Sequence, residues 1–187
     1  MDRAERFSDL YQRQYEAVLR YALRRTDPET ARDVAAETFL VAWRQLDGVP
    51  IESGMAGPWL YGVARRVLAN TERSRLRAER LTTRLGQQQR GASVPDEAGS
   101  IAEIARIRAA LATLSEPDQE ALRLVGWEEL DLAAAALAMG CSSTTMAVRL
   151  HRARRRLERA LGTAGRAGPG PASGRAAPLQ KISQETP

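Results

Sequence analysis

"GCSSTTMAVRLHRARRRLERAL", Gly140–Leu161, is the stretch that decides the fold of this chain. It begins with a glycine and small hydroxyl residues, which are typical of a turn, and continues as a ladder of arginines interrupted by Leu and Ala at helical spacing. The uncharged run LAAAALAM precedes it directly, with Asp131 in position to cap that run. We therefore expect a short helix, a turn at Gly140 and a longer helix from about Ser142, the pattern of a helix-turn-helix.

The longer of these two helices has two chemically different faces. We expect the apolar face to pack inward, and it consists of Met146, Leu150, Ala153 and Leu157. Small side chains at the helix tip and arginines along its shaft suit a helix whose tip enters a DNA groove while its shaft follows the phosphates. The candidate DNA-binding residues are Ser142, Ser143, Thr144, Ala147, Val148, His151, Arg152 and Arg155. Two alternatives remain open. One is a solvated arginine face on an ordinary helical corner. The other is a basic membrane-surface helix, which has less support because the inward face lacks aromatics.

The composition narrows the function classes. The 187 residues carry 28 basic and 23 acidic side chains, a net charge of +5, and only Lys181 among the basic residues is a lysine. Arginine suits bidentate phosphate and base-edge contacts, although GC-rich codon usage would produce the same bias. Cys141 and His151 are the single cysteine and the single histidine, too few for a disulfide, a four-ligand zinc site or the usual nucleophile sets. We expect no enzyme activity, no metal and no cofactor.

Targeting signals are not evident. The first ten residues, MDRAERFSDL, are charged and lack the apolar stretch of a signal peptide. The uncharged run Leu132–Val148 contains a glycine and four consecutive hydroxyl residues, and it is too short for a convincing membrane span. A cytoplasmic protein that does not enter the membrane is expected.

Two blocks of helical periodicity are separated by a polar stretch, and strand patterns are absent from the sequence. Asp27 with Pro28, Ser100 with Glu103, and Ser115 mark helix starts. The sequence predicts an all-α protein made of two small helical bundles joined by a flexible linker and followed by a disordered tail. The expected bounds are 1–82 for the first domain, 83–99 for the linker, 100–161 for the helix-turn-helix domain and 162–187 for the tail.

Together the two blocks resemble the extracytoplasmic-function (group IV) sigma factors of bacterial RNA polymerase. The stretch DVAAETFLVAW, residues 33–43, and its continuation PWLYGVARRVLANTERSR, residues 58–75, are similar to sigma region 2. The second block, down to the RLHRAR run at residues 149–154, is similar to sigma region 4. The resemblance covers about residues 5–80 and 104–161 in the order and spacing of that family.

The resemblance implies a promoter-specificity subunit that is monomeric when free and needs no cofactor. Region 2 docks on the clamp helices of the largest polymerase subunit and recognises the minus-ten element, where it captures a base of the opened strand. Region 4 reads the minus-thirty-five element and lies near the polymerase flap. Many members of the family are inhibited by an anti-sigma factor, which makes such a protein a candidate partner.

Carried over position by position, the resemblance assigns residues to these tasks. The polymerase contact falls on Asp33, Glu37, Arg44 and Gln45. The minus-ten contacts fall on the loop Asp47–Gly57 and on Arg65, Arg66, Asn70 and Arg73. We expect the aromatic residues Phe39 and Trp43 in the core, and for Trp59 we favour the core over stacking on a base.

The chain departs from the family pattern in two places. Ala147 and Val148 stand where the family usually has a basic residue followed by a small polar one, which predicts a shifted or relaxed minus-thirty-five preference. The loop Asp47–Gly57 lacks the basic and aromatic residues that are common there. His151 is expected on the groove face beside Arg152, with a solvated surface histidine as the alternative.

The rival interpretation is a stand-alone helix-turn-helix regulator that binds a palindrome as a dimer. Such a dimer needs an exposed apolar seam, and none is evident outside the two core stripes. It would also leave the first block unexplained, since a repressor has no need of a polymerase-docking helix.

Overall fold

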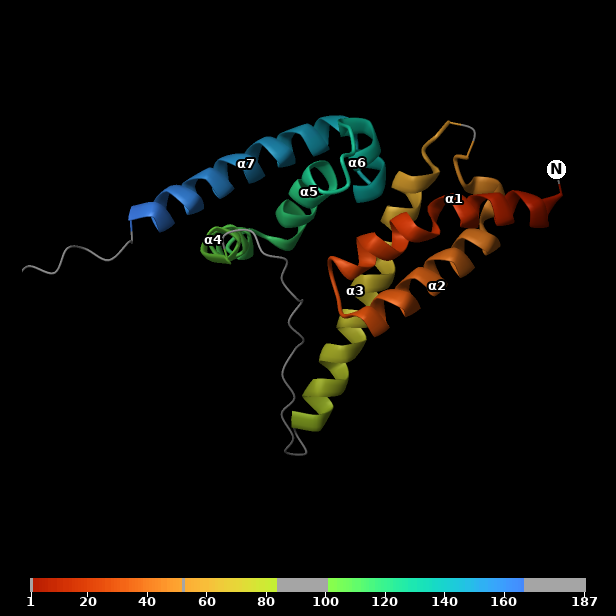
Figure 1. Cartoon of the computed structure of the whole chain (residues 1–187), viewed down its shortest axis with the longest axis horizontal. Coiled ribbons are helices and arrows are strands. Elements are labelled where there is room, and N and C mark those ends of the chain that lie inside the picture. Colours follow the sequence, from red (N-terminus) through yellow and green to blue (C-terminus); the bar gives the residue numbers. More distant parts are fainter. Residues whose placement is uncertain (1, 52, 84–100, 167–187) are drawn as a thin grey trace, which may run out of the picture.

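The computed structural model describes residues 2–51, 53–83 and 101–166, and every regular element in these ranges is helical. The first block contains α1 (Arg3–Leu23), α2 (Pro28–Arg44), a short 3-10 helix (Leu46–Gly48) and α3 (Ala56–Thr83). The second block contains α4 (Ile101–Ala112), α5 (Glu116–Gly126), α6 (Leu132–Met139) and α7 (Ser143–Arg166). Figure 1 shows the two blocks as separate groups of helices that meet where α6 approaches α3. The predicted all-α fold is confirmed.

Local capping explains where several helices begin. Asp2 and Glu5 form a reciprocal capping box at α1. The Asp27 carboxylate accepts hydrogen bonds from the backbone N–H groups of Glu29 and Thr30, with Pro28 in the first turn of α2, as the sequence predicts. Ser115 occupies the N-cap position of α5, but its hydroxyl makes no capping hydrogen bond. The predicted pairing of Ser100 with Glu103 lies outside the described residues.

The helices of the first block form a three-helix bundle. α1 packs on α2 and both pack on α3. The buried apolar side chains at the centre of this bundle include Leu10, Val18, Val34, Phe39 and Leu60. Burying side chains of this size supplies most of the drive to fold, about 1.5–3 kcal/mol for each one fully removed from water.

In the second block, α7 is the long helix on which the others assemble. α4, α5 and α6 all contact α7. Leu114, Leu124 and Met146 are buried where these helices meet, and much of α6 is alanine, which lets neighbouring backbones approach closely. α7 extends to Arg166, past the domain boundary expected at Leu161, while 84–100 and 167–187, most of the expected linker and tail, lie outside the described residues.

The two bundles also pack against each other, a feature that the sequence did not predict. α3 lies along α6, and the core cluster runs from one bundle into the other without a break. The rings of Tyr21 and Tyr61 stack at a centroid distance of 4.8 Å beside this junction. An alternating pattern of apolar residues reveals which face of a helix is buried but not which helix covers it.

Candidate nucleic-acid interface

The turn between α6 and α7 is built from local backbone geometry. Gly140 has a φ of +65°, the left-handed conformation that closes the C-terminus of α6, and its N–H donates to backbone carbonyls of that helix. The Asp131 carboxylate caps the start of α6 by accepting from the Ala134 N–H at 2.8 Å. The Ser142 hydroxyl accepts from the Thr145 N–H at 3.1 Å and so caps α7. The helix-turn-helix is therefore fixed at Asp131, Gly140 and Ser142, the positions where the sequence predicts a helix start, a turn and a second helix start.

The two faces of α7 are arranged as expected. Met146, Leu150 and Ala153 are buried, and Leu157 is half-buried. The side chains at the tip (Ser142, Ser143 and Thr144) are exposed, and so are Val148, His151, Arg152 and Arg155. The structure thus brings the exposed candidate residues together on one side of the helix-turn-helix.

A shallow hollow along α7 adds residues that the sequence analysis missed. It is lined by Thr144, Thr145, Val148, Arg149, Arg152 and Arg156, with Asp118 of α5 at its edge. Arg156 forms an ion pair with Asp118, so this arginine is held in place by the neighbouring helix. Arg149 lies four residues after Thr145 and three before Arg152, so all three share one helical face. This spacing could have identified Arg149 as a candidate DNA-binding residue.

Ala147 occupies a more enclosed position than the other candidates. It is half-buried and lines a second hollow together with Val125 and Leu130, while His151 and Arg154 lie on the same rim. Val148, one residue on, leaves 45% of its surface exposed. This side of α7 therefore presents an apolar patch beside its arginines, which could contact a methyl group such as that of thymine.

The minus-ten candidates on α3 fall into two environments. Arg66, Asn70 and Arg73 are exposed and follow one face of the helix. The Arg73 guanidinium donates to the Asn70 side chain, and the Arg66 Nε donates to the carbonyl of Gly62 at 3.0 Å. Arg65 is half-buried instead, and its nearest hydrogen-bond acceptor is the Met139 carbonyl of α6 at 3.4 Å. The structure therefore does not bring Arg65 to the open surface with the other three.

The loop that precedes α3 is anchored by apolar residues. Leu46, Val49 and Ala56 are buried, and Ile51 packs against the core. Asp47 forms ion pairs with Arg3 at 3.4 Å and with Arg6 at 3.5 Å. Ser53 and Gly54 are exposed at the turn of the loop.

The polymerase candidates share the exposed side of α2 and its end. Asp33, Glu37, Arg44 and Gln45 are all exposed. Leu40 lies among them with 49% of its surface exposed, and sequence reasoning missed this residue. The signal was available, because Leu40 lies three residues after Glu37 and four before Arg44, which places all three on one helical face.

The aromatic residues of this region differ from the sequence expectation in one case. Phe39 is 3% exposed, as expected of a core residue, and Trp59 is half-buried and packs against the core. The core assignment of Trp43 was wrong, because its side is covered only by the first turns of α1 and 39% of its surface remains exposed. The Trp43 ring meets the edge of Phe7 at 5.1 Å and the guanidinium of Arg3 at 5.2 Å.

The described ranges hold neither a candidate metal site nor a helix that could cross a membrane. There, no group of three or more His, Cys, Asp or Glu side chains is placed to hold a metal ion. Over the same residues, no helix combines the length and apolar character needed to cross a membrane.

Comparison with known proteins assigns each of the two helical blocks to a family. Residues 10–80 match the family described as Sigma-70 region 2, and residues 104–157 match Sigma-70, region 4. The chain is 32% identical to the ECF RNA polymerase sigma factor SigL of Mycobacterium tuberculosis over 79% of its length and 84% of that protein. It is 29% identical to the RNA polymerase sigma factor YlaC of Bacillus subtilis over 85% of its length and 94% of that protein.

A solved structure has the same overall arrangement. The sigma factor RpoE of Bartonella quintana, solved in complex with the anti-sigma factor NepR, is similar with a TM-score of 0.62 and 26% sequence identity. The match covers 83% of this chain and 96% of that one. The fold is also shared by CnrH, solved with the cytosolic domain of CnrY, at a TM-score of 0.54 over 84% of this chain and 88% of that one and 22% identity.

Proposed function

Because this chain belongs to the extracytoplasmic-function sigma factors of the sigma-70 family, we propose that it joins core RNA polymerase and directs initiation at promoters with two elements. The family is one of non-enzymatic initiation factors, so the polymerase carries out the chemistry. The observation that carries the proposal is the presence of both domains in one chain, each with an exposed face suited to its task.

The proposed minus-thirty-five surface is the exposed side of α7. Ser142, Ser143 and Thr144 lie at the helix tip, where a phosphate oxygen or a base edge can meet hydroxyl and backbone donors. Ala147, Val148 and His151 face the groove, and Arg152 and Arg155 follow the backbone. Arginine contacts to phosphates position the helix, and the smaller residues near the tip read the sequence.

The proposed minus-ten surface is the face of α3 that carries Arg66, Asn70 and Arg73, with Arg65 beside it. Exposed guanidinium and amide groups supply donors for phosphates and for an unpaired base. The loop from Asp47 to Gly57 contributes shape more than charge, since its apolar side chains anchor it to the bundle.

The proposed polymerase contact is made by Asp33, Glu37, Arg44 and Gln45 around the exposed Leu40. An apolar side chain surrounded by charged ones is a common arrangement at protein interfaces, where the apolar group provides affinity and the charges set the orientation. The clamp helices of the largest subunit are the expected partner of this surface, and the flap is the expected neighbour of the second domain.

We also propose that the protein acts in the cytoplasm as a monomer without a cofactor, and that an anti-sigma factor regulates it. The relatives RpoE and CnrH were solved with the anti-sigma factor NepR and with the cytosolic domain of CnrY, respectively, and these complexes support a partner of that kind.

The experiment that tests the proposed function is in-vitro transcription from a pool of genomic promoter fragments with purified core polymerase. Transcripts that appear only when the protein is added, and that share two upstream elements, are the expected result. The absence of new transcripts, together with tight binding of free DNA by a dimer, would instead identify a stand-alone regulator.

A further inference from the structure

A hollow beside the proposed reading face of α7 has an apolar floor. It lies between α7 and the segment that joins α5 to α6, and its floor consists of Val125, Leu130, Ala147 and Leu150. Leu150 is buried, and the other three side chains are half-buried, so part of each remains open to a ligand. We call this feature the apolar hollow.

The wall formed by Val125 and Leu130 is fixed by the backbone that follows α5. The chain reverses at Glu129, whose φ of +53° is one that residues other than glycine seldom adopt. The Leu130 N–H then donates to the Leu124 carbonyl at 3.1 Å, which returns Leu130 to the end of α5 beside Val125. Both side chains pack against the core cluster. The wall is therefore preformed in the free chain.

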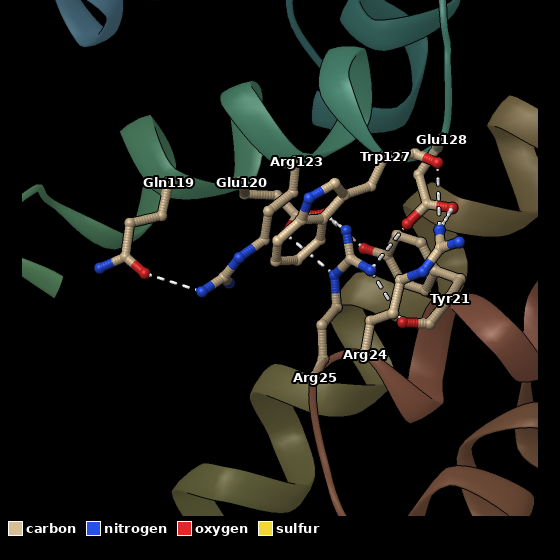
Figure 2. A network of polar contacts seen from close by, with 8 residues as sticks. All are labelled: Tyr21, Arg24, Arg25, Gln119, Glu120, Arg123, Trp127 and Glu128. Atoms are coloured by element: carbon tan, nitrogen blue, oxygen red, sulfur yellow. Dashed lines mark hydrogen bonds and ion pairs between the residues drawn. The ribbon is translucent and has the colours of Figure 1, made fainter. Parts of the chain in front are cut away.

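Glu128 anchors the same turn by ion pairs. Its carboxylate accepts from Arg25 at 3.0 Å and from Arg24 at 2.7 Å, and Figure 2 shows these contacts at the end of α5. The Glu128 side chain is only 4% exposed, so it is held in one position. The turn is thus fixed at three consecutive residues, 128–130, and the shape of the wall is fixed with it.

The apolar hollow is open because residue 147 is an alanine. Its side chain ends at Cβ, and it lines the hollow where α7 passes Val125 and Leu130. A basic side chain, which the family usually has at this position, would extend several bonds further and occupy the space above the floor. The open hollow therefore follows from a departure of this chain from the family pattern.

The floor selects one kind of base edge. Its four side chains carry no hydrogen-bond donor or acceptor, whereas the major-groove edges of guanine, adenine and cytosine present polar groups. A polar edge placed on this floor would give up water without gaining a partner, which is costly. The edge of thymine instead includes a 5-methyl group, which gains by leaving water for an apolar surface. Thymine is therefore the base that fits the hollow.

The rim of the hollow has the charge that DNA requires. His151 and Arg154 lie on it, and both are exposed. Asp131 is the acidic residue of the rim, and its carboxylate is engaged as the cap of α6 by the Ala134 N–H at 2.8 Å. Basic groups around an apolar floor suit a methyl group carried on a phosphate backbone. The hollow is also continuous with the proposed minus-thirty-five surface, because Ala147 and His151 belong to both.

We propose that the apolar hollow binds the 5-methyl group of a thymine in the minus-thirty-five element, and that Val125 and Leu130 determine specificity together with Ala147. The inference rests on the proposed function, and it adds residues outside α7 to the surface that reads the promoter. The methyl group alone distinguishes the bound thymine from a uracil at the same position.

The test removes this methyl group from the DNA and changes nothing else. A promoter that the chain selects in the transcription pool is synthesised with thymine, or with deoxyuridine at every thymine position of its minus-thirty-five element. The affinity of core polymerase assembled with the full chain is measured for both duplexes, and the ratio of the two affinities is the methyl preference. A third duplex, with deoxyuridine only between the two promoter elements, controls for effects on DNA shape.

Two variants alter the wall of the hollow without changing α7. Val125→Thr replaces a methyl group by a hydroxyl and nearly keeps the shape, and Leu130→Ala removes apolar surface. The matched control is Val41→Thr, the same substitution at a half-buried valine of α2. Circular dichroism and thermal unfolding verify that each variant is folded.

Val148→Thr distinguishes the hollow from the open shaft of α7. Val148 is 45% exposed and is the other apolar side chain of this side that a thymine methyl group can meet. A methyl preference that is lost in Val148→Thr and kept in Val125→Thr and Leu130→Ala would place the contact on the shaft, and the proposal would be wrong.

We expect the parent chain and Val41→Thr to favour thymine over deoxyuridine by about fourfold, the factor for one methyl-sized group removed from water. Val125→Thr and Leu130→Ala should each lower this preference to less than about twofold, because part of the apolar contact is lost. A parent chain that is indifferent to the methyl group, or an unchanged preference in both folded variants, would overturn the proposal. A minus-thirty-five element without an A·T pair would do the same.

Failure of the proposed function is a separate outcome. Polymerase that initiates nowhere with this chain would overturn that function, and with it the assignment of thymine to the hollow. Initiation at specific promoters, with equal affinity for the thymine and deoxyuridine forms, would overturn the assignment alone.

Discussion

Ala147 and Val148 are the two proposed recognition residues of α7 that depart from the family pattern. Neither side chain carries a hydrogen-bond donor, and Val148 is largely exposed while Ala147 is half-buried beside Val125 and Leu130. If the proposed function holds, recognition at these two positions depends on shape and methyl contacts, and Arg152 and Arg155 supply the charge further along the helix.

Ala147→Arg is expected to change promoter ranking. A guanidinium at this position can form a bidentate contact to guanine, which discriminates against other bases by about 1–3 kcal/mol. Run-off transcription with core polymerase, on promoters that vary in the minus-thirty-five element, measures the change. Glu158→Gln, which raises the net charge of α7 by one at a position about three turns beyond Ala147, is the control. An equal increase on every promoter variant would indicate only a new phosphate contact.

The residues near a helix end determine where that helix begins or stops, but they do not determine which other helix it packs against. Asp27, Asp131 and Gly140 each act within a few residues of their position, so the sequence predicts these helix ends correctly. The exposure of Trp43 depends on how far α1 extends over α2, and that is a tertiary property. Arg25 and Glu120 meet across 95 positions of sequence, and no periodic pattern connects them. The ion pair between Arg25 and Glu120 and the half-buried position of Arg65 were unpredictable for this reason.

Gly140→Ala is expected to destabilise the helix-turn-helix domain through its backbone. A Cβ at Gly140 would meet nothing within 4 Å, so the cost comes from the left-handed φ of +65°, about 1–2 kcal/mol for a residue other than glycine. Urea unfolding measures it. Gly126→Ala, at a glycine with equally open space and without a positive φ, is the control and should not destabilise the protein. Equal losses in the two variants would contradict this explanation.

The cap of α2 is expected to give stability a pH dependence in the acid range. Backbone and side-chain hydrogen bonds from Thr30 lower the pKa of Asp27 from 3.8 to about 2. A lowered folded-state pKa means that the stabilisation is complete above about pH 4 and is lost as the pH falls toward 2. Asp27→Asn keeps a capping oxygen but cannot titrate there. The free energy of unfolding of the wild type should therefore fall relative to this variant through that window, and a constant difference would refute the assignment.

For the molecule as a whole, the surfaces proposed for polymerase and for DNA are formed by different helices. The exposed side of α2 points away from the second bundle's contact with α3, whereas α3 carries the proposed minus-ten residues and also packs against α6. Substitutions on the exposed side of α2 can therefore test the proposed polymerase contact without disturbing the packing of α3 on α6.

Leu40→Glu is expected to weaken binding to core polymerase at least about tenfold, or about 1.4 kcal/mol. Leu40 is 49% exposed, so the same substitution should change the free energy of unfolding by no more than about 0.5 kcal/mol. Leu76→Glu, at an exposed leucine of α3 outside this surface, is the control. Affinity for core polymerase is measured by fluorescence anisotropy of the labelled chain. Equal weakening by both substitutions would argue against α2 as the docking surface.

The two contacts between the bundles lie on different helices, one at the end of α1 and the other in the first half of α3. A molecule fastened at two separate points can swing apart only when both release within the same interval, whereas either one can begin to close it again. The two bundles are therefore expected to unfold in one cooperative transition, because neither contact can be lost without loosening the other.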